Sequence, residues 1–196
     1  MFLVFEGIDG SGHTTALLKV ADFLKEEGKL LVVTKEPTEG NSYGLEIREL
    51  LKSGKTFDPL ELQKLFLEDR KLHVPKIKEW LKGGSWVLSD RYFYSTIAFG
   101  AAEGIEWQTL IQMNKDFLRP QAAFILDVEA GEAMRRIALR GDPHMRFEKG
   151  EMLAAVRKNY LRLVGEKTFP EMILIDAMPS IEKVTESIFT HIRPLL

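Results

Sequence analysis

A glycine-rich segment near the start of the chain has the residue types and spacing that bind phosphate. It runs from Gly7 to Thr15 with the letters GIDGSGHTT and follows the template G-x-x-x-x-G-K-[ST], except that histidine stands in the lysine position. The glycines let the backbone curl so that successive N–H groups point at phosphate oxygens, and a helix beginning near Thr14 adds the positive end of its dipole. The candidate phosphate ligands are Gly7, Gly10, Ser11, Gly12, His13, Thr14 and Thr15, and the Thr14 hydroxyl is also a candidate Mg²⁺ ligand.

The histidine at position 13 changes the chemistry of this loop. A lysine there places a fixed positive charge on the transferring phosphates, where developing negative charge must be neutralised. An imidazole is shorter and, with a usual pKa of about 6.5, is mostly neutral at pH 7, although a nearby phosphate would raise that pKa. Two interpretations follow for His13: an impaired loop that still binds nucleotide, or a working imidazolium. The first is favoured.

The elements that must position this loop follow an alternating pattern. Short, continuously apolar runs are typical of strands buried on both faces, and amphipathic stretches between them are typical of helices. The expected strands are 2–5, 30–33, 86–88, 122–126 and 172–175, and the expected helices are 14–27, 45–52, 59–82, 107–118, 130–139, 151–165 and 180–192. This order predicts an α/β fold of the P-loop NTPase type, with a roughly five-stranded parallel sheet and helices on both faces. We expect one P-loop domain over 1–196, with a short lid at approximately 139–149.

Composition narrows the classes of function. The chain has 196 residues, of which 45% are hydrophobic and 29% charged, so it can bury a core. Its 27 Lys+Arg and 29 Asp+Glu leave a net charge of −2, which argues against a nucleic-acid or membrane-surface binder. With no cysteine there is no disulfide, thiolate nucleophile or cysteine-based zinc site. The apolar runs are far shorter than the roughly 18 residues of a membrane span, and the sequence predicts a soluble, cytoplasmic protein.

Several short motifs, taken in order along nearly the whole chain, resemble those of the thymidylate kinase family. They are Phe5-Glu6-Gly7-Ile8-Asp9-Gly10-Ser11-Gly12, Lys35-Glu36-Pro37, Ile47-Arg48, Phe66-Leu67-Glu68-Asp69-Arg70, Asp90-Arg91-Tyr92, Ser95-Thr96, Ala98-Phe99 and Ile175-Asp176-Ala177. The chain departs from the family pattern at His13, at Lys35, where arginine is usual, and at Gly100, where many bacterial relatives carry glutamine.

The resemblance implies Mg²⁺-dependent transfer of the γ-phosphate of ATP to dTMP, by in-line displacement, in a homodimer. It implies that Asp9 meets the 3′-hydroxyl of the acceptor, and that Arg91 and Arg48 bind the acceptor phosphate. It also implies that Asp90, with Thr14, holds Mg²⁺. The remaining implied substrate ligands are Phe66, Arg70 and Thr96 at the base, Phe99 at the sugar, and Glu36.

Catalytic roles under the same resemblance fall to Asp9, His13, Arg91, Arg140 and Arg146. The last two lie in the expected lid, where Arg146-Phe147-Glu148 is similar to the lid motif of the family. A lid arginine would bring positive charge to the phosphates and would relieve the loss of lysine at position 13. The sequence does not separate Arg140 from Arg146 in this role.

Other interpretations remain beside this one. The main alternative is a nucleotide-binding protein of the same fold with weak or no kinase activity because of His13. A GTPase is discounted because Asn114-Lys115-Asp116 is one residue short of a guanine reader and falls within a predicted helix. Within the enzyme class, the nearest alternative is a nucleoside kinase or another nucleoside monophosphate kinase. For Glu6, a structural and a functional carboxylate stay equally open, and surface or packing roles are expected for His73 and His191.

Overall fold

The computed structural model describes residues 1–54, 56–141 and 147–196. The first half of the chain forms β1 Phe2–Gly7, α1 His13–Glu26, β2 Leu31–Lys35, α2 Ser42–Ser53, α3 Pro59–Lys82, β3 Trp86–Asp90 and α4 Phe93–Ala102. The second half forms α5 Trp107–Asn114, β4 Ala122–Asp127, α6 Ala130–Leu139, α7 Phe147–Gly165, β5 Met172–Asp176, α8 Ile181–Ile192 and the short η1 Arg193–Leu195.

The strands form a five-stranded sheet in the order β2-β3-β1-β4-β5. Each neighbouring pair is parallel, and its register aligns the ends of the strands: Phe5 pairs with Asp90, and Gly7 pairs with Leu126. All strands therefore end at one edge of the sheet, which is where ligands bind in open α/β folds. The α/β fold predicted from the sequence is confirmed.

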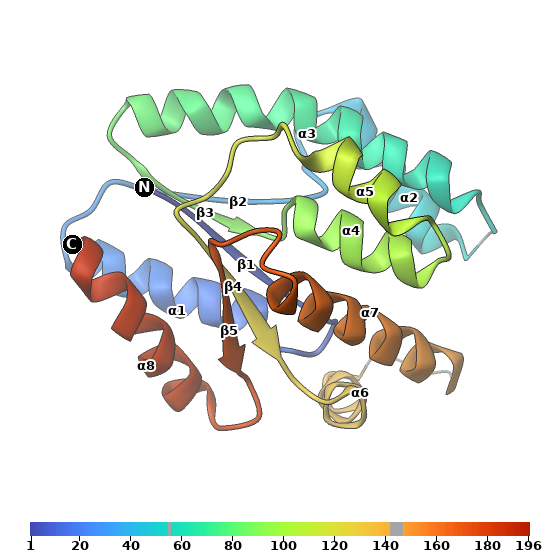
Figure 1. Cartoon of the computed structure of the whole chain (residues 1–196). Coiled ribbons are helices and arrows are strands. Elements are labelled where there is room, and N and C mark those ends of the chain that lie inside the picture. Colours follow the sequence, from blue (N-terminus) through green and yellow to red (C-terminus); the bar gives the residue numbers. More distant parts are fainter. Residues whose placement is uncertain (55, 142–146) are drawn as a thin grey trace.

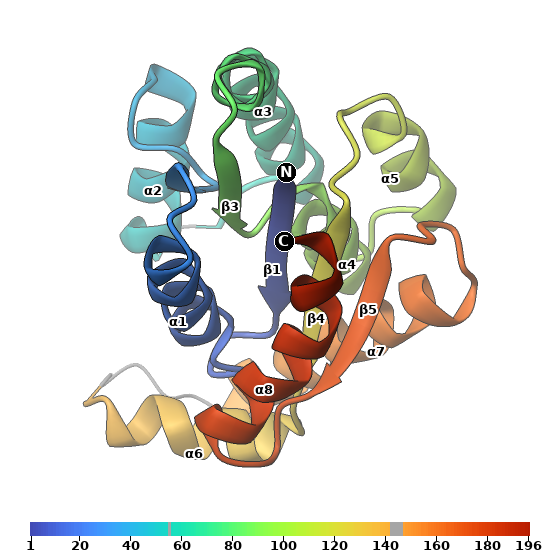
Figure 2. The same ribbon diagram turned by 90° about the vertical axis from the view of Figure 1, so that its left-hand side faces the viewer.

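Helices cover both faces of the sheet. The helices α1 and α8 pack together on one face, and α3, α4 and α7 lie on the opposite face (Figure 1). The view turned by 90° shows α1 and α8 side by side in front of the strands, with α6 near the strand ends (Figure 2). Within the described residues, no helix is long and apolar enough to cross a bilayer.

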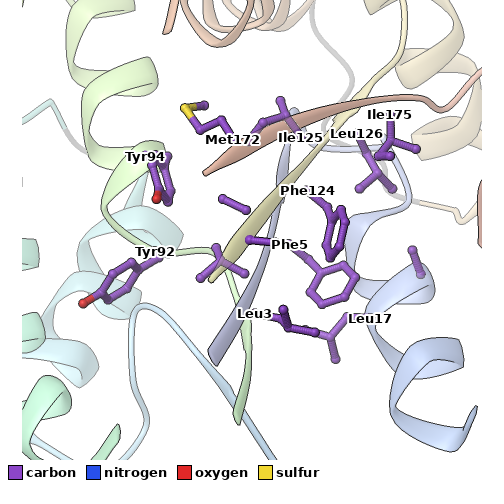
Figure 3. Close-up of a cluster of buried hydrophobic side chains, with 14 of the residues drawn as sticks. Leu3, Phe5, Leu17, Tyr92, Tyr94, Phe124, Ile125, Leu126, Met172 and Ile175 are labelled. Carbon is purple, nitrogen blue, oxygen red and sulfur yellow. The ribbon is translucent and has the colours of Figure 1, made fainter. Parts of the chain in front are cut away.

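The core joins the sheet to these layers. Phe5 of β1 and Phe124 of β4 contact each other with ring centroids 5.4 Å apart, and both lie beside Leu17 of α1 (Figure 3). Tyr92 and Tyr94 lie on the other side of the sheet and are also fully buried. Because burial of each large side chain contributes about 1.5–3 kcal/mol, this two-sided core holds the sheet edge firmly in place.

The largest differences from the sequence prediction are one helix that the prediction lacks and two displaced helix ends. The helix α4 was absent from the predicted set because FYSTIAFGAA is apolar around most of its circumference, and a helix buried on most sides has no amphipathic period. The helix predicted over 107–118 ends at Asn114, whose side chain is held by the carbonyl of Leu110 and by Arg70. The helix predicted from residue 151 begins at Phe147.

Candidate active site

The glycine-rich loop joins β1 to α1 at the carboxyl edge of the sheet. Gly10 and Gly12 have φ values of +83° and +92°, which residues with side chains rarely adopt. A Cβ at Gly10 would also lie 2.5 Å from the carbonyl oxygen of Ala133, so only glycine fits there. The first turn of α1 has no side-chain cap, which leaves its N–H groups available to an anion.

The side chain of Ser11 points to the same conclusion. Its hydroxyl is buried and has no hydrogen-bond partner among the described residues. Because a buried hydroxyl without a partner is unfavourable, a bound group that forms a hydrogen bond with this atom would stabilise it. The geometry of the loop is that of a phosphate-binding turn.

His13 forms a buried pair with Asp90 behind this loop. Its side chain is 10% exposed, and Nδ1 donates to Oδ1 of Asp90 at 2.7 Å. Burial and the nearby Arg91 guanidinium lower the pKa of His13 below its usual value, despite the hydrogen bond to Asp90. The imidazole is therefore neutral at pH 7 and does not replace the lysine charge. This favours the impaired loop over the imidazolium for the free protein.

Asp90 and Thr14 offer oxygen ligands beside the loop. Thr14 Oγ1 donates to Oδ2 of Asp90 at 2.8 Å, and Thr14 itself is exposed to solvent. Burial opposes the ionisation of Asp90, but hydrogen bonds from His13 and Thr14 outweigh it and lower the pKa of the carboxyl. An ionised carboxylate next to a hydroxyl is a donor set that suits Mg²⁺. The two residues predicted as metal ligands are thus brought together.

A cavity of about 400 Å³ opens on one side of the loop. It lies between the sheet edge and the helices α3 and α4. Every predicted substrate residue except Arg48 lines it: Asp9, Glu36, Phe66, Arg70, Arg91, Thr96 and Phe99. Residues far apart in the sequence therefore converge on one site.

Arg91 is fixed at the mouth of this cavity. Nη2 donates to Oδ1 of Asp9 at 2.7 Å, and Nη1 donates to the carbonyl of Gly7 and to Oγ of Ser95 at 2.9 and 3.0 Å. The ring of Phe99 lies 5.2 Å from the guanidinium carbon. The guanidinium is thus held by a carboxylate and an aromatic face at the place where the acceptor phosphate is expected.

Arg70 lies at the buried end of the cavity. It is 1% exposed and donates to Glu36 Oε2 at 2.8 Å through Nε and to Thr96 Oγ1 at 3.0 Å through Nη2. Its Nη1 donates to Asn114 at 2.9 Å. These bonds fix the plane of the guanidinium, and one of the two Nη1 hydrogens remains for a ligand.

Glu36 and Arg48, two of the predicted substrate ligands, already have partners within the protein. The Oε1 of Glu36 contacts His73 Nδ1 at 2.9 Å, while Oε2 accepts from Arg70, so both carboxylate oxygens already have protein partners. Arg48 donates to the carbonyl of Pro37 and does not line the cavity. His73 is a buried member of this network, and its Nε2 lies 2.8 Å from Thr34 Oγ1.

A second cavity of about 400 Å³ lies on the other side of the loop. Ser11, Gly12 and Thr15 line it, together with Arg140, which is exposed at the end of α6. Arg146, the other predicted lid arginine, lies outside the described residues. Of the predicted nucleotide ligands, Ser11, Gly12 and Thr15 therefore line this cavity, whereas Thr14 lines a third cavity together with Asp90.

Sequence reasoning missed Arg136 in the second cavity. Its Nη2 donates to the carbonyl of Ala177 at 2.9 Å, and its Nε donates to Glu132 at 2.7 Å. The motif Ile175-Asp176-Ala177 could have indicated that this part of the chain lines a cavity. Residues that follow a buried parallel strand lie at the carboxyl edge of the sheet, where ligands bind. The role of an arginine from α6 depends on packing that the sequence pattern does not show.

Glu6 lies beneath the first cavity and is fully buried. Its Oε1 accepts the backbone N–H of Tyr92 at 2.7 Å, and its Oε2 accepts from Ser95 Oγ at 2.6 Å and from Tyr160 OH at 2.7 Å. Burial raises the pKa of this carboxyl, against the lowering effects of Arg91 and the hydrogen bonds. The carboxylate thus holds the start of α4, which carries residues of the cavity.

The loop, the paired side chains of Thr14 and Asp90 and the two cavities are the features of a P-loop nucleotide phosphotransferase. A model of the family described as thymidylate kinase matches residues 5–188. The chain belongs to the thymidylate kinase family. The reaction of this family is the transfer of phosphate from ATP to dTMP, which forms dTDP, and the chain is accordingly a dTMP kinase.

Similar proteins match this chain over most of their own length. A probable thymidylate kinase of Sulfurisphaera tokodaii is 41% identical over 94% of this chain and 92% of its own length. One of Thermococcus kodakarensis is 39% identical over 100% of this chain and 98% of its own length. The thymidylate kinase of Desulfotalea psychrophila is 35% identical over 99% of this chain and 95% of its own length.

Proposed function

We propose that ATP and dTMP occupy the two cavities on either side of the glycine-rich loop and that phosphate passes between them along this loop. The observation that carries the proposal is the placement of Asp9 in one cavity and of Ser11 and Gly12 in the other. A bond between the γ-phosphorus and the acceptor phosphate forms as the bond to ADP breaks. No general base is required, because the acceptor is already an anion.

The first cavity provides separate groups for each part of dTMP. Arg91 binds the acceptor phosphate, and Asp9, which is paired with it, meets the 3′-hydroxyl. Phe66 and the free hydrogen of Arg70 Nη1 bind the base, while Phe99 lies against the sugar and disfavours a 2′-hydroxyl. Glu36 acts indirectly, by holding Arg70 in its plane. This assignment follows from which side chains line the cavity and which are already paired.

The second cavity accepts ATP. The N–H groups of the loop bind its phosphates, and Thr14 with Asp90 would hold Mg²⁺, which neutralises phosphate charge when bound. Arg140 lines this cavity and supplies positive charge from the lid expected over 139–149. Since His13 is neutral, we propose that turnover is slower than that of a chain with lysine at this position.

The test is ADP formation from ATP with dTMP, dUMP, dGMP or no acceptor, with Mg²⁺ and with EDTA. The expected result is Mg²⁺-dependent turnover that is fastest with dTMP and slow in absolute terms. If neither the parent nor His13→Lys turns over any acceptor while both fold and bind ATP, the chain acts as a nucleotide-binding protein instead. Loss of the Mg²⁺ requirement would contradict the assigned role of Thr14 and Asp90.

We also propose a cytoplasmic homodimer, as the resemblance implies. The exposed side chains of Leu45 on α2 and Leu72 on α3 support a contact through this pair of packed helices, because each is about half exposed, at 51% and 48%. Light scattering of the full chain measures the mass directly. Substitution of both leucines by lysine is expected to yield the monomer, and an unchanged mass would place the contact elsewhere.

A further inference from the structure

The backbone of Arg91 has a strained conformation that neighbouring groups maintain. Its φ is +66°, in the left-handed region that side chains disfavour. Its N–H donates to the carbonyl of Phe5 at 2.9 Å, and its carbonyl accepts from Ser89 Oγ at 2.7 Å. The N–H of the next residue, Tyr92, donates to Glu6. Such strain persists only where the surroundings over-determine it, and it is common at functional sites.

A cluster of three oxygens lies directly behind the Arg91 side chain. We define it as Glu6 Oε2, Ser95 Oγ and Tyr160 OH, which are 2.6, 2.7 and 2.9 Å apart in their three pairs. Ser95 Oγ also accepts from Arg91 Nη1 at 3.0 Å. Ser95 Oγ is within hydrogen-bond distance of the Arg91 guanidinium and of the other two oxygens of the cluster. A change at Glu6 or Tyr160 therefore alters the acceptor that Ser95 offers to Arg91.

Tyr160 reaches this oxygen cluster from a distant part of the chain. It lies on α7, 154 residues beyond Glu6, and its side chain is 2% exposed. The helix α7 packs against α4, so the ring is held in place by packing as well as by its hydroxyl. The reaction assigned above does not use Tyr160, yet its hydroxyl is in a network with the group that binds the acceptor phosphate.

We propose that Tyr160 is a positioning residue for Arg91, acting through Ser95 and Glu6 to fix the guanidinium for the phosphate of dTMP. The inference rests on the proposed role of Arg91 in the first cavity. Without the tyrosine hydroxyl, Glu6 Oε2 loses one of its two hydroxyl donors and Ser95 Oγ loses a hydroxyl neighbour, so the acceptor that Ser95 offers to Arg91 is held less firmly. The base site keeps its own network through Arg70 and Thr96, so only phosphate binding is affected.

The experiment compares Tyr160→Phe with the matched control Tyr94→Phe. Both substitutions remove a buried hydroxyl that donates to a carboxylate, but Tyr94 contacts Glu171, away from Arg91. Calorimetric titration measures the dissociation constants of dTMP and of thymidine, which has no phosphate. We expect Tyr160→Phe to weaken dTMP binding about three- to tenfold and to leave thymidine binding within about twofold. Tyr94→Phe is expected to change neither, although both variants lose thermal stability.

A second comparison tests whether Tyr160 acts through Arg91. In an Arg91→Ala background, Tyr160→Phe is expected to have no further effect on dTMP binding, because its effect already requires the guanidinium. Equal weakening of dTMP and thymidine, unchanged dTMP binding, or an additive loss in the double variant would each overturn the inference. Should Tyr160→Phe not fold, Ser95→Ala breaks the same link and carries the same expectation. Failure of the parent itself to bind dTMP would overturn the proposed function as well, so the two failures are distinguishable.

Discussion

The Nδ1 atom of His13 lies 2.7 Å from Oδ1 of Asp90, in a pair that is mostly shielded from water. The carboxylate can only accept, so the proton is on Nδ1 and the other ring nitrogen carries a lone pair. The chain therefore presents an uncharged group where the phosphate-loop template has a lysine. This relationship connects the glycine-rich loop with Asp90, the proposed metal ligand, and it is the basis for the expected effects of substitutions at position 13.

We expect His13→Lys to increase kcat for dTMP phosphorylation. A lysine supplies the fixed charge on the transferring phosphates, and a single such electrostatic contact is worth on the order of 10²- to 10³-fold in rate. The measurement is Mg²⁺-dependent ADP formation at saturating ATP and dTMP. His13→Gln, which cannot carry charge, is the control and should match the parent. A parent that turns over as fast as the lysine variant would show that the charge comes from elsewhere.

The stability of the free chain should depend on pH through His13. The pKa of His13 is lowered in the folded chain and is about 6.5 in the unfolded chain. Well above pH 6.5 the imidazole is neutral in both states, so it makes no pH-dependent contribution to stability there. As the pH falls below 6.5, the unfolded chain binds a proton that the folded chain does not, and stability decreases. His13→Asn keeps a donor for Asp90 and should lose less thermal stability between pH 7 and pH 5.5. Equal profiles for the parent and this variant would contradict the expectation.

Arg70→Leu should strongly destabilise the fold. The substitution leaves the carboxylate of Glu36 buried without its cationic partner, and removal of one member of a buried ion pair typically lowers the free energy of unfolding by about 3–5 kcal/mol. Urea unfolding followed by circular dichroism measures this change. Lys71→Leu on the same helix removes an exposed pair with Glu68 and should leave the midpoint almost unchanged. Similar losses for the two variants would argue against the buried network.

Phe99→Ala should weaken discrimination against ribonucleotides. The ring lines the first cavity beside Arg91, and its removal opens space for a 2′-hydroxyl. We expect the ratio of kcat/KM for dTMP over ribothymidine monophosphate to fall about tenfold, as for other single-group steric contacts. Phe99→Leu retains most of the volume and should keep part of the discrimination. An unchanged ratio in both variants would contradict the proposed contact between Phe99 and the sugar.

Contiguous motifs made much of the site predictable from the sequence. The loop from Gly7 to Thr15, the Phe66–Arg70 spacing and Asp90-Arg91 each lie within a few residues, and the ends of parallel strands bring them to one edge. The interpretation of Glu36 was incomplete because its partners His73 and Arg70 come from α3, and a pattern does not show which carboxylate oxygens are already bonded.

Contacts between distant segments were not predictable in the same way. Tyr160 and Arg136 are separated from the loop by more than a hundred residues, and each reaches the site only because its helix packs in one particular place. The helix α4 was missed because it is apolar on most sides, so the periodicity that marks a surface helix is absent. The sequence therefore predicts the candidate ligand-binding residues better than it predicts the residues that hold those side chains in position.

The division of the ligand groups between two cavities that share one loop has a consequence for inhibitor design. A molecule that joins thymidine to adenosine through a chain of phosphates would place one end beside Asp9 and the other beside Ser11 and Gly12. Once one end is bound, the other meets its cavity at an effective concentration of about millimolar, and the joined molecule gains roughly 10²- to 10⁴-fold in affinity over either half. The length of the phosphate chain that gives the tightest binding would then measure the span between the two sites in solution.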